Sequence, residues 1–171
     1  MDVFEALRTI VAVRKFQDKP VPDDLIHRIV EAARVTSSSR NLQPWHFVVV
    51  QDRATLRKLG ELAPSGPYTA DSAFAIVVAY EKESQFGVSD ASLAVHSMML
   101  TAWAEGVGSN WVGFSGRYGV TIAPLLGIPD DHEILAVVPF GYPVLELGKG
   151  IKKRKALGEV AHREKFGQPF A

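Results

Sequence analysis

Apolar residues recur along the chain with two periodicities, one typical of helices and one typical of strands. The first helical pattern follows Asp2, a residue type favoured at helix N-termini, and predicts a helix that extends to about Val13. Its apolar face would consist of Val3, Leu7, Ile10 and Val11. Pro20 and Pro22 interrupt this pattern, and a second amphipathic helix is predicted to begin at Asp23. Each of the two helices is expected to bury one face.

Short runs of β-branched and aromatic residues predict buried strands. They are residues 45–50 (WHFVVV), 74–80 (FAIVVAY) and 133–142 (EILAVVPFGY), with a shorter extended segment at 110–114. Residues 89–105 predict a long helix that is apolar nearly all round and ends at Gly106 and Gly108. Shorter helical patterns occupy residues 56–62 and 120–126. The long apolar helix is expected in the middle of the protein.

The composition is that of one globular domain. The 171 residues are 47% hydrophobic and 22% charged, a balance typical of a single domain with a large core. Strands mixed with helices of unequal length favour an α+β layered fold. From Pro143 onward the composition shifts to glycine and lysine, and Phe166 and Phe170 near the end have little to pack against. We interpret this tail as a surface for a partner.

Charge and residue content exclude several classes of function. The 19 Lys and Arg residues balance 19 Asp and Glu residues, which disfavours nucleic acid and anionic membranes as partners. The absence of cysteine excludes disulfides and thiolate catalysis, and the five histidines lack metal-ligand spacing, so no metal site is expected. No apolar run approaches the length of about twenty residues that a membrane span needs, and the N-terminus lacks a signal-peptide pattern. A cytoplasmic protein is predicted.

Two polar features remain as candidates for ligand binding. Arg14 and Lys15 follow the first helix, and a basic run occupies residues 152–155, so these cations are candidates for binding one anion. Residues 37–45 (SSSRNLQPW) place three hydroxyls and two amides before a tryptophan, which suits a polar ligand. Each feature also has a simpler interpretation, because cations often form a solvated surface and such polar segments often form turns.

Four segments, in order, resemble the nitroreductase family of flavin mononucleotide (FMN) enzymes. The first is residues 13–22 (VRKFQDKPVP) with the helix at 25–34 (LIHRIVEAAR), and the second is residues 37–50 (SSSRNLQPWHFVVV). The third is residues 93–113 (LAVHSMMLTAWAEGVGSNWVG), and the fourth begins at Pro139 (PFGYP) and leads to the basic tail. Together they cover nearly the whole chain.

The resemblance implies the architecture in more detail. Residues 1–171 would form a single nitroreductase-like α+β sandwich, with a central, mainly antiparallel sheet flanked by helices. It also implies an obligate homodimer with two FMN sites at the subunit interface. The C-terminal extension, residues 143–171, would be exchanged between the two subunits.

The resemblance also assigns cofactor-binding roles to individual residues. Arg14 would point at the pyrimidine end of the flavin, and backbone amides near Val112 and Gly113 would face its N5 atom. Lys152 and Arg154 would hold the phosphate. Three further residues would come from the other subunit toward the ribityl-phosphate region, namely Ser38, Ser39 and Asn41.

The implied function is an FMN-dependent oxidoreductase with ping-pong kinetics. NADH or NADPH would supply reducing equivalents, and a small organic acceptor such as a nitroaromatic compound or a quinone would receive them. Because flavin N5 carries the chemistry, no catalytic side chain is expected. Two alternatives stay open: a non-catalytic flavin- or ligand-binding dimer, and a dehalogenase or flavin-destroying enzyme on the same scaffold.

One part of the chain departs from the family pattern. Family members usually end the first helix with two basic residues and a serine, where this chain has Ile10, Val11 and Ala12. The loss of two polar contacts is expected to weaken FMN affinity by about ten- to a thousandfold, with Arg8 as the nearest replacement. Residues 64–71 and 114–118 have no fixed pattern, and we expect them to select the acceptor.

Overall fold

The computed structural model describes residues 1–113, 119–145 and 152–170. The helices, including two short 3-10 helices, are α1 (Val3–Thr9), α2 (Asp23–Arg34), η1 (Ser39–Asn41), α3 (Arg53–Leu62), η2 (Pro67–Asp71), α4 (Gly87–Ala104), α5 (Gly119–Leu126) and α6 (Leu157–Val160). The strands are β1 (Trp45–Val50), β2 (Phe74–Glu81), β3 (Gly108–Ser109), β4 (Val112–Gly113) and β5 (His132–Gly141). The predicted strands and the central helix are therefore present within a residue or two of the expected bounds.

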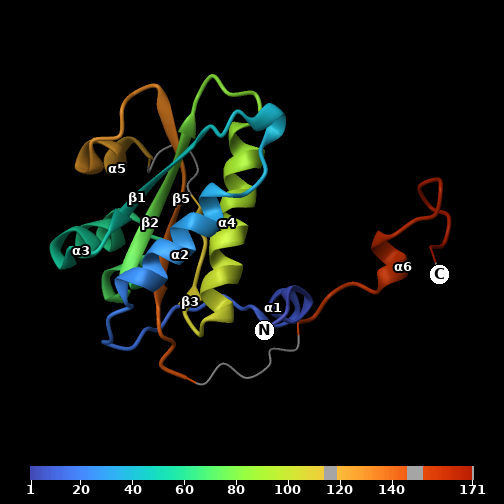
Figure 1. Cartoon of the computed structure of the whole chain (residues 1–171), viewed down its shortest axis with the longest axis horizontal. Coiled ribbons are helices and arrows are strands. Elements are labelled where there is room, and N and C mark those ends of the chain that lie inside the picture. Colours follow the sequence, from blue (N-terminus) through green and yellow to red (C-terminus); the bar gives the residue numbers. More distant parts are fainter. Residues whose placement is uncertain (114–118, 146–151, 171) are drawn as a thin grey trace.

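The strands form one antiparallel sheet (Figure 1). Its order is β1-β2-β5-β3, and β4 pairs with β5 beyond the end of β3. Phe47 pairs with Val78 across β1 and β2, and Val77 pairs with Val137 across β2 and β5. Every residue of β2 from Phe74 to Tyr80 is buried, as expected for an apolar run in the middle of a sheet. The predicted mainly antiparallel sheet is confirmed.

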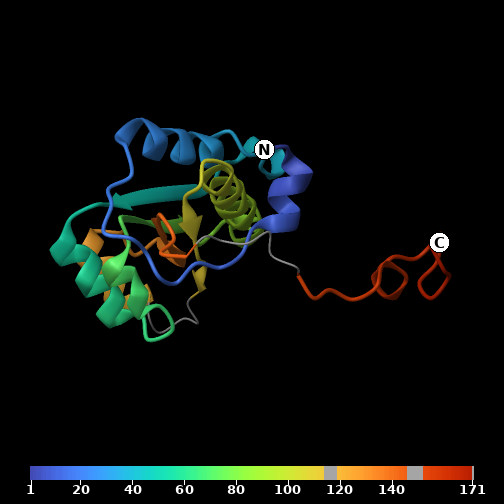
Figure 2. The same ribbon diagram turned by 90° about the horizontal axis from the view of Figure 1, so that it is seen from below.

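Helices cover both faces of this sheet (Figure 2). Alternate residues of β2 point to opposite faces, so Ile76 and Val78 pack with α2 and α4, whereas Ala75 and Val77 pack with α3 and α5. Ile29 of α2 is fully buried within the first of these two cores. The arrangement is a helix–sheet–helix sandwich, which confirms the α+β fold class.

The central helix α4 is less enclosed than its sequence predicts. The side that faces the sheet and α2 is fully buried, including Ala94, Val95 and Met98. Val88 and Leu93, by contrast, are at least half exposed. The helix therefore exposes individual apolar side chains on its surface, and within the described residues nothing covers them.

The prediction for the first helix is wrong in both its end and its buried face. Helix α1 ends at Thr9, and the chain then becomes extended, with the Val13 amide donating to the Ser109 carbonyl at 2.9 Å. The apolar residues after Thr9 suit a strand as well as a helix, and the free edge of β3 pairs with them. Val3 is 73% exposed and Leu7 is 40% exposed, whereas Ala6 and Thr9 point inward.

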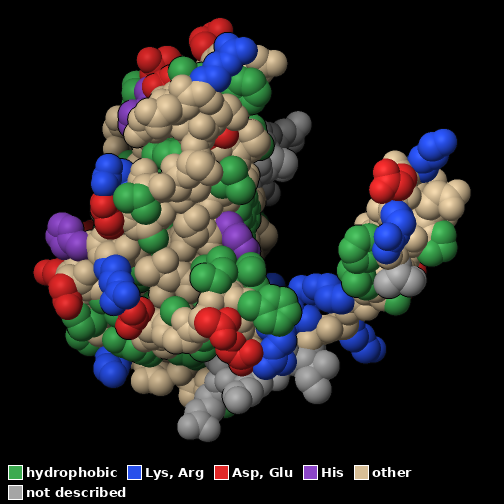
Figure 3. Space-filling model, turned by 45° about the vertical axis from the view of Figure 1, so that its right-hand side comes forward, with side chains coloured by type: hydrophobic (Ala, Val, Ile, Leu, Met, Phe, Trp, Pro, Cys, Tyr) green, Lys and Arg blue, Asp and Glu red, His purple; other side chains and the backbone are tan. Residues whose placement is uncertain are grey.

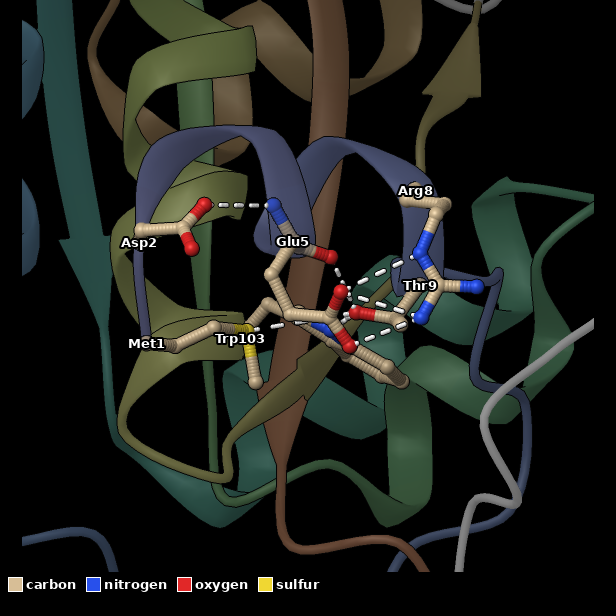
Figure 4. Close-up of polar contacts among 6 residues, drawn as sticks. All are labelled: Met1, Asp2, Glu5, Arg8, Thr9 and Trp103. Atoms are coloured by element: carbon tan, nitrogen blue, oxygen red, sulfur yellow. Dashed lines mark hydrogen bonds and ion pairs between the residues drawn. The ribbon is translucent and has the colours of Figure 1, made fainter.

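Polar contacts fix α1 at its start and at its end (Figure 4). The Asp2 carboxylate accepts from the Glu5 amide at 2.8 Å, which caps the first turn. At the other end the Thr9 hydroxyl donates to the Glu5 carbonyl at 2.6 Å and accepts from the Trp103 indole N–H at 2.9 Å. The second bond ties α1 to the last turn of α4.

The C-terminal segment projects away from the body of the molecule (Figures 1 and 2). Its first described residue, Lys152, donates from Nζ to the Leu7 carbonyl at 2.7 Å, so the segment begins beside α1. Leu157, Val160 and Phe166 are exposed, the last by 93%. Hydrophobic side chains also lie at the surface of the body on the side from which the tail leaves (Figure 3). The tail therefore carries apolar groups that its own chain does not cover.

None of the helices in the described part of the chain is long and apolar enough to cross a lipid bilayer.

Thr9→Val is expected to lower the free energy of unfolding by about 1–3 kcal/mol, because the buried Trp103 indole N–H loses its acceptor while the side-chain volume is kept. Urea denaturation at a fixed protein concentration measures the change. Thr9→Ser keeps the hydroxyl and serves as the control, with an expected loss below about 1 kcal/mol. Equal destabilisation by the two substitutions would show that the hydrogen bond contributes little.

Candidate functional site

Arg14 lies on an extended segment that is anchored on both sides. The Val13 amide donates to Ser109 of β3, and the Gln17 amide donates to the Tyr142 carbonyl at 2.8 Å. Val13 and Phe16 are buried, whereas Arg14 is exposed. The inward side chains of Val13 and Phe16 and the two backbone bonds hold this segment in place, and the Arg14 side chain lies at the surface.

Arg14 lines an open depression with a volume of about 600 Å³. The other residues that line it are Lys15, Phe16, Asp18, Arg53, Asp71 and Val144. The Arg53 guanidinium is already occupied, since it donates to the carbonyls of Ser72 and Ala70. Within the described residues Arg14 forms no ion pair, so its donors remain available to a ligand with hydrogen-bond acceptors.

The predicted polar loop lies at the start of α4. Arg40, Asn41 and Gln43 all have positive φ angles, between 52° and 57°, which non-glycine residues rarely adopt. The Ser38 hydroxyl oxygen accepts from the Gln43 amide at 3.0 Å, and the Asn41 side chain is exposed. This conformation turns the loop tightly. It leaves the Ser38 hydroxyl hydrogen and the side-chain amide of Asn41 available to a ligand.

Ser39 is held differently, by a buried carboxylate. Its amide donates to Asp90 Oδ2 at 3.0 Å, and its hydroxyl donates to Asp90 Oδ1 at 3.1 Å. Asp90 lies in the first turn of α4 and is only 2% exposed. Sequence reasoning missed Asp90, although an acidic residue inside an otherwise apolar helix was a signal that could have identified it.

One chain does not bring the loop and Arg14 together. Asp90 and Trp103, which contact the loop and α1 respectively, are 13 residues apart on α4, or about 20 Å along its axis. Figure 1 shows η1 at one end of α4 and α1 at the other. Within one chain, Arg14 and residues 38–41 therefore lie toward opposite ends of α4.

The predicted backbone donors lie at the sheet margin. Val112 and Gly113 form β4, which pairs with Val137 and Ala136 of β5. In an antiparallel pair, successive residues alternate between facing the partner strand and facing away from it. One of the two amides of β4 therefore points away from β5, where a ligand atom is able to accept from it. Val112 is buried and Gly113 is exposed.

The basic residues of the tail lie beside α1. The Lys152 ammonium donates to the Leu7 carbonyl near the C-terminal end of α1, and burial together with the charge of Arg154 lowers the pKa of Lys152. Arg154 is exposed and donates to the Lys153 carbonyl at 2.9 Å. The two cations are near each other, and the remaining donors of Arg154 face solvent.

The residues that depart from the family pattern have a packing role. Ile10 and Val11 are partly buried against the small cluster that contains Val13 and Trp103. Arg8, the nearest basic residue, forms an ion pair with Glu5 at 2.9 Å. Apolar packing therefore replaces the basic residues here, and Arg8 would have to share its donors between Glu5 and a ligand.

Of the two segments expected to select the acceptor, residues 114–118 lie outside the described residues. The other segment contains η2, where the Tyr68 hydroxyl accepts a hydrogen bond from the Asn110 side chain. Asn110 is buried between β3 and β4. This contact connects η2 to the segment that leads into β4, which carries the predicted backbone donors.

Across the described residues, no cluster of histidines and carboxylates is arranged to hold a metal ion.

Comparison with known proteins gives a consistent result. The family model described as the nitroreductase family matches residues 8–67 and 65–142. A protein of Methanothermobacter thermautotrophicus, described as a candidate NADH dehydrogenase/NAD(P)H nitroreductase, is 38% identical over 149 residues, which cover 84% of this chain and 78% of that protein. A protein of Archaeoglobus fulgidus with the same description is 36% identical over 162 residues, which cover 91% of this chain and 93% of that protein.

Solved structures agree with the sequence match to the nitroreductase family. The FMN-dependent nitroreductase of Clostridium difficile R20291 superposes with a TM-score of 0.89 at 25% identity, over 96% of this chain and 100% of that chain. A protein of Parabacteroides distasonis, described like the first relative, gives a TM-score of 0.87 at 28% identity over 95% of this chain and 98% of that chain. The sequence match and the shared fold cover the sheet, both helical layers and the segment that carries Arg14, and the chain belongs to the nitroreductase family.

Proposed function

We propose that the protein is an FMN-dependent oxidoreductase that passes reducing equivalents from NADH or NADPH to a small organic acceptor, such as a nitroaromatic compound or a quinone. The observation that carries the proposal is Arg14, a cation without an ion-pair partner among the described residues. A fixed backbone presents it to an open depression of about 600 Å³. Relatives whose names include NAD(P)H nitroreductase or FMN-dependent nitroreductase support this assignment.

The residues present fit FMN. When bound, FMN supplies the redox chemistry at its N5 atom. Arg14 would donate to the pyrimidine carbonyls, and its positive charge favours added negative charge at that end of the ring. The outward amide of Val112 or Gly113 would donate to a ring acceptor. Arg154 has donors free for a phosphate, and Lys152 would have to exchange its bond to Leu7 for one.

The chain's own residues bind and orient, and none is required as a nucleophile or a general acid. The depression beside Arg14 is open, so a donor and an acceptor are able to occupy the same exposed position in turn. This arrangement would allow ping-pong kinetics without a separate nucleotide-binding domain.

The proposed active unit is a homodimer in which each site uses both chains. The loop at Ser38 and the segment at Arg14 lie at opposite ends of α4, so the second chain supplies the loop. Apolar surface on α1, on the outer side of α4 and on the tail is available for the interface, including Phe4, Leu93 and Phe166. Residues 1–171 form one domain in this proposal, and the tail from 143 onward packs on the partner.

A non-catalytic flavin- or ligand-binding dimer is the second candidate function. The specific observation in its favour is that Ile10 and Val11 pack into a core cluster where family members usually carry basic residues. Fewer charged contacts at this point would weaken FMN binding.

We expect the purified chain, reconstituted with FMN and then desalted, to keep the yellow flavin absorbance and to lose it when NADH or NADPH is added without oxygen. Absorbance spectroscopy checks both steps. Retained flavin that neither nicotinamide bleaches would identify the non-catalytic binder. A chain that retains no FMN at all would contradict the oxidoreductase and a flavin-binding dimer, and would leave only a dimer that binds another ligand.

Arg154→Ala is expected to weaken FMN binding by about ten- to a hundredfold and riboflavin binding by less than about twofold, because only FMN has a phosphate to lose a charged contact. Flavin fluorescence titration measures both affinities. Arg163→Ala removes a tail cation that donates to the Phe170 carbonyl and is the matched control, with no expected change. Equal weakening of the two flavins by Arg154→Ala would assign Arg154 to the structure of the tail.

Light scattering is expected to give a mass about twice the 18.7 kDa of one chain. Leu93→Asp places a charge on the exposed apolar side of α4 and should shift the population toward monomers that no longer bind FMN. A monomer that binds FMN as tightly as the wild-type protein would show that one chain suffices.

A further inference from the structure

The buried carboxylate of Asp90 is unusual because no cation compensates it. Within the described residues Asp90 forms no ion pair, and its side chain accepts hydrogen bonds from the amide and the hydroxyl of Ser39. A buried charge is costly unless hydrogen bonds satisfy it, and the N-terminal end of α4 adds a favourable dipole. The two donors of Ser39 reach different carboxylate oxygens, and an asparagine in the same position would offer an acceptor to only one of them, because its amide nitrogen only donates. The carboxylate therefore matches Ser39 in particular.

Asp90 and Ser97 together hold the loop on α4. The two residues are two helical turns apart on one side of the helix, and the hydroxyl oxygens of Ser97 and Thr36 lie 2.8 Å apart. Directly after these two contacts, Arg40 and Asn41 have positive φ angles. Such conformations persist only where surrounding contacts enforce them. The bonds between Ser39 and Asp90 supply that enforcement on the residue that precedes Arg40.

We infer that Asp90 is a positioning residue for FMN binding, and that it commits the Ser39 hydroxyl to the ribityl chain and not to the phosphate. The inference rests on the proposed function. The Ser39 hydroxyl hydrogen is used on Asp90, so its oxygen can only accept a further hydrogen bond. Phosphate oxygens also only accept, whereas ribityl hydroxyls donate. The negative charge of Asp90 opposes a phosphate at the same position.

The Ser38 hydroxyl has the opposite hydrogen-bonding role to that of Ser39. Its oxygen accepts from the Gln43 amide, so its hydrogen remains free to donate. Adjacent serines in one loop therefore present different chemistry, with a donor at Ser38 and an acceptor at Ser39. This difference separates the part of the loop that suits a phosphate from the part that suits a hydroxyl chain.

The test measures FMN and riboflavin affinities of the full-length chain by flavin fluorescence titration, together with melting temperatures. Riboflavin keeps the ribityl hydroxyls and lacks the phosphate. Asp90→Asn removes one of the two acceptors with little change in shape. We expect it to weaken both flavins by at least about tenfold and to the same extent. Ser39→Ala should also weaken both flavins equally, and the double variant should bind no more weakly than Asp90→Asn alone.

Asp52→Asn is the matched control. Asp52 accepts from the amide and the hydroxyl of Thr55 at 2.8 and 2.7 Å, a pairing like that of Asp90 with Ser39. Asp52 caps α3, however, and the whole of β1 separates it from the loop. This substitution should leave both flavin affinities within about twofold of wild type, even where it lowers the melting temperature. The comparison separates positioning of the loop from general destabilisation.

Three results would overturn the role assigned to Asp90. Unchanged affinity in both Asp90→Asn and Ser39→Ala would show that the contact does not position the flavin. Loss of affinity for FMN alone would show that Ser39 contacts the phosphate. A wild-type chain that binds neither flavin would overturn the proposed function as well. Should Asp90→Asn fail to fold, Ser39→Ala, which retains Asp90, decides between the same outcomes.

Discussion

The burial of α4 against the sheet is the constraint on which the rest of the structure depends. Its inner side packs into the core formed by β2 and α2, so the helix cannot shift along its axis without disrupting that core. Each end of α4 carries one polar side chain that holds a different part of the chain, Asp90 at the start and Trp103 at the end. The length of α4 therefore sets the separation between the polar loop and α1.

This separation explains why a small protein of this kind would build its site from two chains. The loop presents hydroxyl and amide groups at one end of the helix, and the outward Arg14 lies toward the other. Apolar side chains on the outer side of α4, such as Leu93, lie between these two groups and remain uncovered in one chain. In the proposed dimer, a second copy would cover such side chains and supply its loop to Arg14, so the interface and the site would form together.

Packing and binding compete at the end of α1. Ile10 and Val11 contribute to the cluster that holds α1 against α4, and Arg8 is paired with Glu5. The same positions would otherwise be available for charged contacts to a cofactor. In the proposed site, the loss of those contacts would place more of the binding on Arg14, on the loop and on the tail, so the conformation of the loop would matter more.

The sequence alone determined the elements whose signals are local. The run from Phe74 to Tyr80 contains no charged residue and forms the fully buried strand, and Gly106 ends α4 with a φ of 79°, a conformation that glycine adopts without strain. Four segments in order, including those around Arg14 and residues 37–50, also identified the family, because each is a contiguous string of residues.

Only the tertiary structure decided the features that depend on distant partners. Residues 10–13 suit a helix and an extended segment equally, and a bridge to the free edge of β3 selects the extended conformation. The partner of Ser39 lies 51 residues away in sequence, so no local pattern links it to Asp90. Local propensity acts over a few residues, whereas the placement of a hydroxyl against a carboxylate follows from how α4 packs on the sheet.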